Sequence, residues 1–295
     1  MPFATSMKDI IYYAIPVFAL SLVVEILYFR YLKKHEHHYN TRDTVSSLSM
    51  GIGNVITGLV SKAVVFGALV LVYQVRLFDM NPGAWWYWVA IFFADDFSYY
   101  WFHRTSHMVR YFWASHVVHH SSQYYNLGTA LRQTWTGNIS GAFVFYLWMP
   151  FIGFDPVDVF IMQTASLIYQ FWIHTEAVGK LPAFLEFIFN TPSHHRVHHG
   201  SDIKYLDRNH AGILIIWDRM FGTFKEEEGR PHYGITQNLE SHNLLQIAFH
   251  EWRAILRDIS KAPDLKSAIG YVFGPPGWSH DHSRQTSKQL KKSQH

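Results

Sequence analysis

The sequence predicts an all-α membrane protein with about five spans and a cytoplasmic helical lobe that holds a histidine-rich dimetal site. Three observations carry this prediction: several long apolar runs, an uneven distribution of Lys and Arg around them, and three dense groups of histidines. We expect residues 1–295 to form one integral membrane domain. The chain has 20 histidines and no cysteine, which excludes disulfides, thiolate zinc sites and a cysteine nucleophile.

Apolar runs long enough to cross a bilayer mark the expected spans, because about 20 helical residues match the hydrocarbon thickness. The expected spans cover residues 10–29, 51–75, 84–102, 139–153 and 157–173. The last two come from one apolar stretch that is broken at "GFDP", and we interpret them as a hairpin. The first run is too long for a cleaved signal peptide, and its charges follow it instead of preceding it.

Positive charges set the expected orientation, since Lys and Arg stay preferentially on the cytoplasmic side. One side of the expected spans carries Arg30, Lys33, Lys34, Arg42, Arg104, Arg110 and Arg132, and the other side carries Lys8 and Arg76. This places the metal-site segments 103–137 and 174–260 in the cytoplasm of a bacterial inner membrane or endoplasmic reticulum protein. The tail, residues 283–295, is expected to be disordered.

Three short segments with helical spacing contain the densest histidines: "HRTSH" at 103–107, "HVVHH" at 116–120 and "HRVHH" at 195–199. Residues three and four apart share a helix face, and each neutral imidazole offers one lone pair to a metal. The catalytic and metal-ligand candidates are His103, His107, His116, His119, His120, His195, His198 and His199. Eight donors exceed the four that one tetrahedral zinc takes, so two metals are inferred, and all-nitrogen sites with open positions suit iron.

Two further histidines are candidate metal ligands: His174, which ends the fifth expected span, and His194. The isolated His210, His232, His242 and His250 are expected to be ordinary surface or core residues. The same holds for "HEHH" at 35–38 and "HDH" at 280–282, which are expected to contact solvent or lipid headgroups.

Two acidic residues, Asp95 and Asp96, lie inside the third expected span, where ionisable groups are costly. One of them could hold a ligand histidine through a hydrogen bond, and a polar contact between helices is an equally good interpretation. The run at 243–256 is amphipathic, and it could lie on the membrane or cap the cytoplasmic lobe.

The order of these motifs resembles the fatty acid hydroxylase and sterol desaturase superfamily, membrane enzymes built around three histidine boxes and two irons. The resemblance covers about residues 90–225, through "WFHRTSH", "ASHVVHHSSQYYNLGTALRQ", "NTPSHHRVHHG" and "WDRMFGTF". These motifs are most similar to the alkylglycerol monooxygenase branch, which oxidises ether lipids with a tetrahydropterin. The resemblance implies an O2-dependent lipid monooxygenase that hydroxylates or desaturates an alkyl or acyl chain. It also implies two iron ions, with tetrahydrobiopterin or another external reductant.

The expected partners follow from what the sequence contains. A membrane lipid is the expected substrate, because the histidines lie at the ends of the spans, where a chain can rise from the bilayer. No nucleotide-binding fingerprint is visible, so a separate electron donor is expected. The basic residues form no continuous stripe, so nucleic acid is not an expected partner. Two other hypotheses stay open: a membrane zinc metallohydrolase, and a non-enzymatic metal transporter or sensor.

Overall fold

The computed structural model describes residues 2–32 and 38–293. Its helices are, in chain order, α1 (Pro2–Leu32), α2 (Thr41–Tyr73), α3 (Trp85–Met108), α4 (Arg110–His120), α5 (Leu127–Ala130), the 3₁₀ helix η1 (Ala142–Tyr146), α6 (Trp148–Ile152), α7 (Pro156–Ile173), α8 (Ala183–Ile188), α9 (Pro192–His198), α10 (Ile216–Met220), α11 (Leu244–Ser260), α12 (Leu265–Phe273) and α13 (Ser287–Lys292). Among the described residues, strand-like pairing is limited to two isolated bridges. The predicted all-α class is confirmed.

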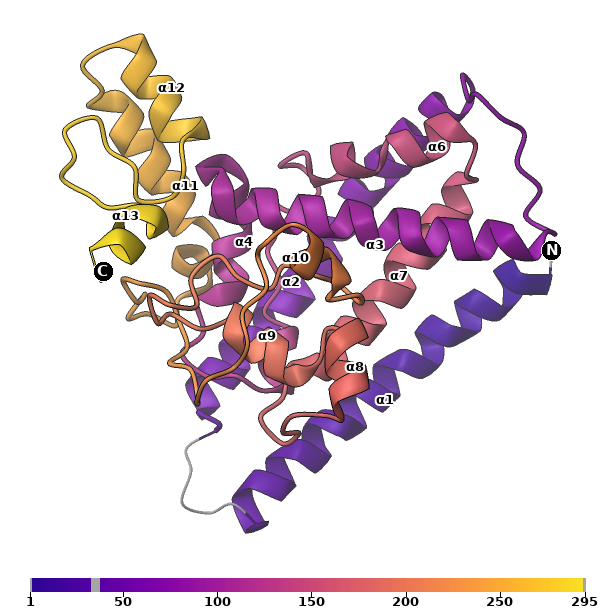
Figure 1. Cartoon of the computed structure of the whole chain (residues 1–295), viewed down its shortest axis with the longest axis horizontal. Coiled ribbons are helices and arrows are strands. Elements are labelled where there is room, and N and C mark those ends of the chain that lie inside the picture. Colours follow the sequence, from indigo (N-terminus) through magenta and orange to yellow (C-terminus); the bar gives the residue numbers. More distant parts are fainter. Residues whose placement is uncertain (1, 33–37, 294–295) are drawn as a thin grey trace.

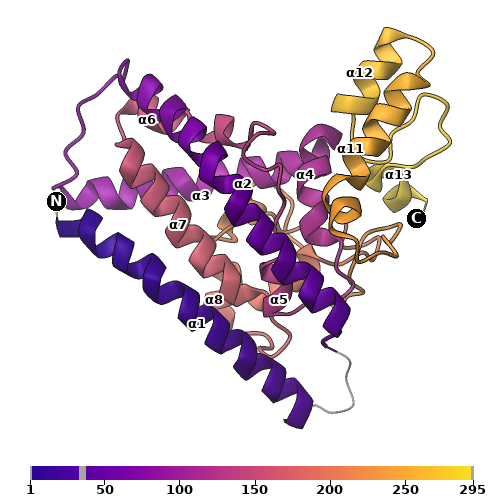
Figure 2. The ribbon, with the colours of Figure 1, turned by 180° about the vertical axis from the view of Figure 1, so that it is seen from behind.

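Three long helices, α1, α7 and α2, run side by side on one face of the molecule (Figure 2), and α3 crosses them on the opposite face, which is in front in Figure 1. Phe18 of α1 stacks on Phe171 of α7 with ring centroids 4.0 Å apart. One buried core joins Leu69 of α2, Ile91 of α3 and Val159 of α7. This packing fixes the amino-terminal half of α3, and the first histidines project from the other half.

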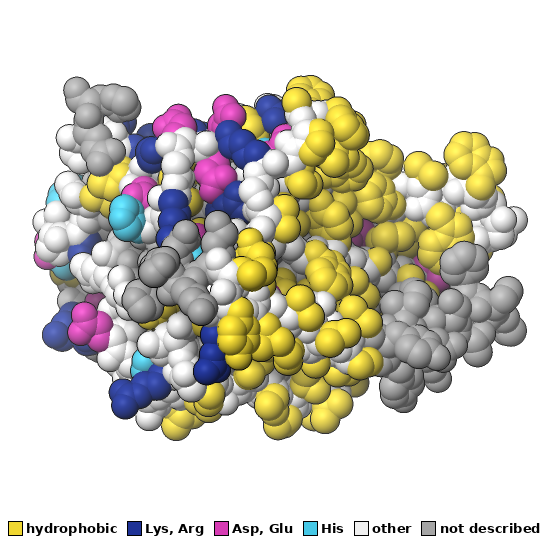
Figure 3. Space-filling model, turned by 90° about the horizontal axis from the view of Figure 1, so that it is seen from below, with side chains coloured by type: hydrophobic (Ala, Val, Ile, Leu, Met, Phe, Trp, Pro, Cys, Tyr) yellow, Lys and Arg dark blue, Asp and Glu magenta, His cyan; other side chains and the backbone are white. Residues whose placement is uncertain are grey.

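Within the described residues, two helices are long and apolar enough to cross a membrane: Ala14–Leu32 within α1, and α2. A core helix of a soluble protein passes the same test, but it would be mostly buried. Only 17% of the apolar window of each helix is buried here. Side chains such as Leu20, Leu59 and Val60 are 64–74% exposed, and hydrophobic side chains cover one half of the surface in Figure 3. This exposed apolar surface suits contact with lipid.

The other three predicted spans differ from the observed helices. α3 and α7 cover the third and fifth predicted spans but are not among the two candidate membrane helices. Residues 139–153, predicted as the fourth span, form only η1 and α6, of five residues each. A single α-helix rises about 1.5 Å per residue, so neither piece can cross a 30 Å hydrocarbon layer. The prediction of a continuous fourth helix is wrong.

Residues 134–151, which include most of this broken segment, nevertheless follow α2 from Asn54 to just beyond its carboxyl end. Asn54 of α2 donates to the Thr134 carbonyl at 2.5 Å, and Asn138 donates to Ser61 at 3.0 Å. Leu77, just after α2, donates its N–H to the Phe151 carbonyl at 2.8 Å. The predicted break at "GFDP" is observed: Gly153 has a φ of 124°, and Asp155 caps α7, whose first residue is Pro156.

The C-terminal helices pack against α4 and away from α1 (Figure 1). Ile247 and Ala248 on one face of α11 are buried against Met50 of α2 and Val118 of α4. The amphipathic run at 243–256 therefore caps the lobe. Residues 283–293, predicted to be disordered, are ordered: Thr286 and Gln289 form the capping box of α13.

Candidate metal centre

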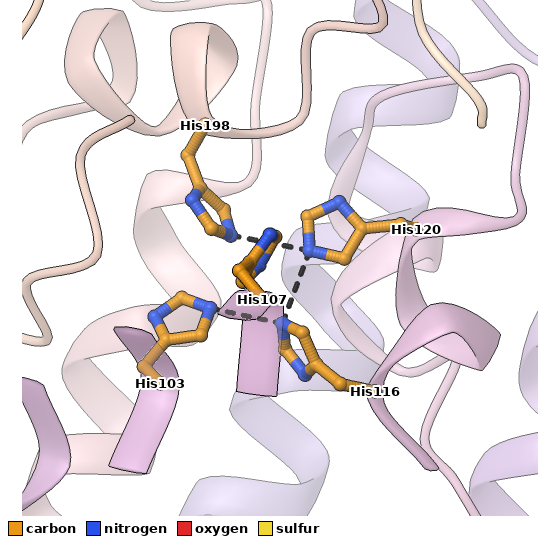
Figure 4. A group of neighbouring side chains, drawn as sticks. All are labelled: His103, His107, His116, His120 and His198. Atoms are coloured by element: carbon orange, nitrogen blue, oxygen red, sulfur yellow. Dashed lines mark hydrogen bonds between the residues drawn. The ribbon is translucent and has the colours of Figure 1, made fainter. Parts of the chain in front are cut away.

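Five imidazoles from three helices form one group, which we call the five-histidine group: His103, His107, His116, His120 and His198. Their ligand nitrogens all lie within 4.8 Å of one another. The first two lie one turn apart on α3, the next two lie one turn apart on α4, and the last comes from α9 (Figure 4). Helical i, i+4 spacing puts each pair on one face, and the turn at Val109 points both faces at the same space.

A second set, the four-histidine group, lies beside the first and contains His119, His174, His195 and His199. Its ligand nitrogens also lie within 4.8 Å of one another. The rings of His120 and His199, one from each group, stack with centroids 4.4 Å apart. The structure thus brings together nine of the ten sequence candidates, and it divides them between two adjacent sites.

Backbone carbonyls fix the proton on four of these rings. The Nδ1 contacts are His103 to His210 at 2.8 Å, His198 to Arg208 at 2.9 Å, His119 to Arg132 at 3.3 Å and His174 to Gln170 at 2.6 Å. A carbonyl oxygen can only accept a hydrogen bond, so Nδ1 carries the proton and Nε2 presents a lone pair. This is the ligand orientation that metal-binding histidines need.

The distances between the facing nitrogens fit a cation in each group. His119 Nε2 and His174 Nε2 lie 3.0 Å apart although both carry lone pairs, which repel unless a positive charge lies between them. Metal–nitrogen bonds of about 2.1 Å place neighbouring ligands of one ion about 3.0–3.4 Å apart. In the five-histidine group, His116 Nε2 lies 2.9 Å from His103 Nε2 and 3.1 Å from His120 Nε2.

Two further nitrogens support the same conclusion. The Nε2 atoms of His107 and His199 are buried and have no hydrogen-bond partner among the described residues. An unsatisfied buried nitrogen is costly in a protein interior, whereas a metal ion would satisfy it. The donor sets of both groups therefore fit a metal.

Burial keeps these imidazoles neutral at physiological pH. It lowers the pKa of His195 and His199 well below the ordinary value, and the neighbouring histidines lower it further. Burial lowers the pKa of His198 to about 3 and that of His119 to about 4. A neutral imidazole has the free lone pair that a metal requires.

His194 is the one candidate that lies outside both groups. Its Nε2 is 3.0 Å from a carboxylate oxygen of Glu186, and its Nδ1 faces the backbone of Phe189 and Thr191. It occupies the third position of α9, where it completes a capping box with Thr191. This geometry gives His194 a role in starting α9 and does not support it as a ligand.

Asp218 is a buried support that sequence reasoning missed. Its carboxylate accepts hydrogen bonds from the backbone N–H groups of His210 and Ala211, each at 2.8 Å. It thereby fixes the His210 carbonyl, which orients His103. The sequence signal was present, because Asp218 belongs to "WDRMFGTF".

Neither aspartate of α3 hydrogen-bonds a ligand histidine. Asp96 accepts from the N–H groups of Ile213 and Leu214 and from Trp217 Nε1, at 2.7–3.0 Å. It fastens the segment before α10 to α3, so the interpretation as a polar contact between elements holds for Asp96. Asp95 is buried, and its Oδ1 has no hydrogen-bond partner in residues 2–32 and 38–293.

The remaining described histidines belong to neither group. His38 is buried against Phe29 and lies 2.5 Å from Glu176, so the solvent or lipid contact expected for it is wrong. His35 and His37 lie outside the described residues. His210 is buried beside the five-histidine group, which it supports through its carbonyl.

Comparison with known proteins agrees with this geometry. Residues 88–223, which contain all nine grouped histidines, match the fatty acid hydroxylase family model. Residues 88–223 are thus similar to fatty acid hydroxylases. The resemblance expected from the motifs is confirmed.

Similarity to individual relatives extends over most of the chain. The alkylglycerol monooxygenase of Homo sapiens is 37% identical over 263 residues, which cover 88% of this chain and 58% of the relative. The alkylglycerol monooxygenase of Danio rerio is 39% identical over 269 residues, which cover 90% and 59%. The ornithine lipid hydroxylase OlsE of Rhizobium tropici is 29% identical over 166 residues, which cover 52% and 46%. The chain thus spans a little over half the length of the alkylglycerol monooxygenases. No solved structure matches it.

Proposed function

We propose that this chain is a membrane-bound lipid hydroxylase that uses dioxygen, two iron ions and an external electron donor. The observation that carries the proposal is the pair of adjacent all-histidine groups inside the segment that matches the fatty acid hydroxylase family. The relatives support a lipid substrate, since their names refer to alkylglycerols and to an ornithine lipid. The coarse reaction is insertion of one oxygen atom into a C–H bond of an alkyl or acyl chain.

The two groups divide the metal-binding work. The five-histidine group would hold one iron, and the four-histidine group would hold the other. All-nitrogen donor sets suit iron better than magnesium or manganese, which prefer oxygen ligands. When bound, the irons supply the chemistry that side chains lack, namely reduction of dioxygen and cleavage of an unactivated C–H bond. Hydroxylation consumes one O2, two electrons and two protons and also yields one water, so a donor must deliver the two electrons.

The residues of this chain prepare that chemistry. The carbonyls of Arg132, Gln170, Arg208 and His210 hold four imidazoles with Nε2 pointing inward. Burial keeps the rings neutral and excludes bulk water from them. Asp218 fixes the segment that provides one of the carbonyls.

We propose a topology with five crossings, with the fourth made by residues 134–153 in irregular form. Non-helical backbone is tolerated at membrane depth where it is packed against protein, and this segment packs along α2. The metal centre then faces the cytoplasm, with the excess of Lys and Arg. Reporter fusions in the loop 74–84 and after residue 293 test this. A cytoplasmic signal from the loop 74–84, or an external one from the carboxyl end, contradicts it.

Metal analysis of the purified protein, paired with oxygen uptake during turnover of an ether lipid, tests the function. We expect two irons per chain and one hydroxylated lipid per O2 consumed when a reductant is present. Zinc in place of iron, with lipid hydrolysis and no oxygen uptake, would establish the metallohydrolase. Metal flux across vesicles without lipid oxidation would establish a transporter.

A further inference from the structure

A cavity of about 750 Å³ reaches the five-histidine group from the side of the C-terminal helices. His107, His120 and His198 form its inner end. None of the four-histidine group lines it. Ligand sites typically enclose about 300–1,000 Å³, so the cavity has room for a small molecule or for one end of a larger one.

The two walls of this cavity have different origins. The inner wall comes from α3, α4 and α9, within residues 88–223 that match the family. The outer wall comes from residues 234–237, from α11 and from residues 276–290, which lie beyond that match. The outer wall therefore lies outside the segment that matches the family model, and its side chains can adapt the cavity to a particular ligand.

The charges on the wall favour an anion. Arg110 lies 2.6 Å from Glu251 and 2.7 Å from Asp258, and Arg284 lies 2.9 Å from Asp258. Arg257 also lines the cavity, and it makes no ion pair within the described part of the chain. Asp207, which also lines the wall, lies 3.6 Å from His107 Nδ1 and forms no ion pair with Arg257. The guanidinium of Arg257 thus has no carboxylate partner among the described residues, and its fork geometry suits phosphate or carboxylate.

His250 adds a requirement for a hydrogen-bond donor. Its Nδ1 donates to the Ile247 carbonyl at 3.1 Å, which leaves Nε2 as an acceptor. This Nε2 is buried and has no hydrogen-bond partner in the part of the chain that the structure describes, and the residue lines the cavity. A hydroxyl or ammonium group on a ligand would satisfy it.

We propose that this cavity binds the headgroup of the lipid substrate, and that the headgroup carries a phosphate or carboxylate beside a hydroxyl or ammonium group. Arg257 recognises the anion and His250 accepts from the donor. The proposal rests on the proposed lipid hydroxylase function. A lining this rich in charged and polar side chains does not suit the alkyl group of a lipid. The alkyl group of the substrate therefore approaches the metals from another side.

Arg257→Gln tests the anion site, with Arg253→Gln as the matched control on the same helix. Arg253 is exposed and does not line the cavity. The probes are a single-chain ether lipid with a phosphate monoester headgroup and the same lipid with a bare glycerol headgroup. Binding is measured on solubilised protein with and without iron, so that it is read separately from turnover.

We expect the wild type to prefer the phosphate lipid, and Arg257→Gln to reduce this preference about fivefold, because an exposed ion pair is partly screened by solvent. Arg253→Gln should retain the preference. His250→Ala should weaken the binding of both lipids, since both carry a glycerol hydroxyl. An unchanged preference in Arg257→Gln would overturn the proposal.

Two other outcomes would also overturn it. Inorganic phosphate that displaces the lipid at the lipid's own concentration would make this an ion site. If Arg257→Gln changed the KM for the reductant and left lipid binding unchanged, the cavity would be the binding site of the electron donor. If the wild type and all variants bound the lipids as expected but the wild type did not oxidise them, only the proposed hydroxylase function would be contradicted.

Discussion

The five-histidine and four-histidine groups use the same donor atoms, but they differ in access. Three members of the five-histidine group line the large cavity, while the four-histidine group lies behind it, against Tyr125 and Gln170. The two groups also differ in the backbone carbonyls that orient their imidazoles. Segment 208–218 orients His103 and His198, whereas the carbonyls of Arg132 and Gln170 orient members of the other group.

This difference indicates a division of labour between the two sites. An ion in the five-histidine group can meet molecules that enter the cavity, while an ion in the four-histidine group would not face this cavity. Substitutions in either group should stop turnover. Substitutions in the supporting segments should affect one group at a time, and this separates the two sites experimentally.

The largest effect is expected for His120→Ala, which removes a proposed ligand of the five-histidine group. Lipid oxidation should fall at least about 100-fold, more than loss of a supporting residue typically causes. Iron content should fall from two per chain towards one, because the four-histidine group keeps its ligands. Iron analysis and oxygen uptake measure both. His232→Ala is the control, since that side chain is 86% exposed. Full turnover in His120→Ala would refute the assignment.

Asp218→Asn should weaken metal binding at the five-histidine group alone. The amide replaces one carboxylate oxygen with a donor, so either the His210 or the Ala211 N–H loses its acceptor. We expect iron affinity at the five-histidine group to fall about 10-fold, with the four-histidine group unchanged. Competition with a chelator should then show one weakened iron and one wild-type iron. Equal weakening of both irons would show that the sites are not separately supported.

Asp96→Asn and Asp95→Asn replace neighbouring carboxylates that differ in the hydrogen bonds they accept. Asp96 accepts three hydrogen bonds, so its replacement should cost about 2 kcal/mol of unfolding free energy, while folded protein keeps its iron. Asp95→Asn should cost less, because its Oδ1 has no partner to lose among the described residues. Thermal unfolding and iron analysis of both variants check this order. A larger loss of iron in Asp95→Asn would reveal a role that the contacts do not show.

Acid should destabilise the metal-free protein. The pKa values of His198 and His119 are lowered to about 3 and 4, below the ordinary value of 6.5. As the pH falls below about 6.5, the unfolded chain takes up protons that the folded chain does not, so the free energy of unfolding decreases. The unfolding temperature should be lower at pH 5 than at pH 7.5, and iron should delay the loss. A constant unfolding temperature would contradict burial of neutral rings.

The smallest effect is expected for His194→Ala, outside both groups. It should lower the unfolding free energy by about 1 kcal/mol through loss of the capping box, and iron content should stay at the wild-type value. His194→Gln should be milder, because glutamine can fill the same capping position. Loss of one iron in both variants would place His194 among the ligands.

Much of the site could be predicted from the sequence, because i, i+3 and i, i+4 spacing states directly which imidazoles share a helix face. The division of nine histidines into two groups could not, since His119 and His120 are adjacent in sequence and belong to different groups. His194 shows the same limit: its spacing fits a ligand, but the local start of α9 decides its role. The broken fourth segment was missed because hydropathy records apolar composition and not the 3₁₀ geometry of residues 142–146.

The separation of the ligands along the chain has a consequence for assembly. Under the proposed function, one iron joins His103 on α3 to His198 on α9, and the other joins His119 on α4 to His174 at the end of α7. Each ion then closes a loop of the polypeptide, as a disulfide would in a chain that had cysteine. Because an ion binds the folded chain and not the unfolded one, iron stabilises the folded protein beyond its metal-free form, and metal delivery becomes linked to folding. Cells short of iron should therefore accumulate less of the folded protein, not merely a less active form of it.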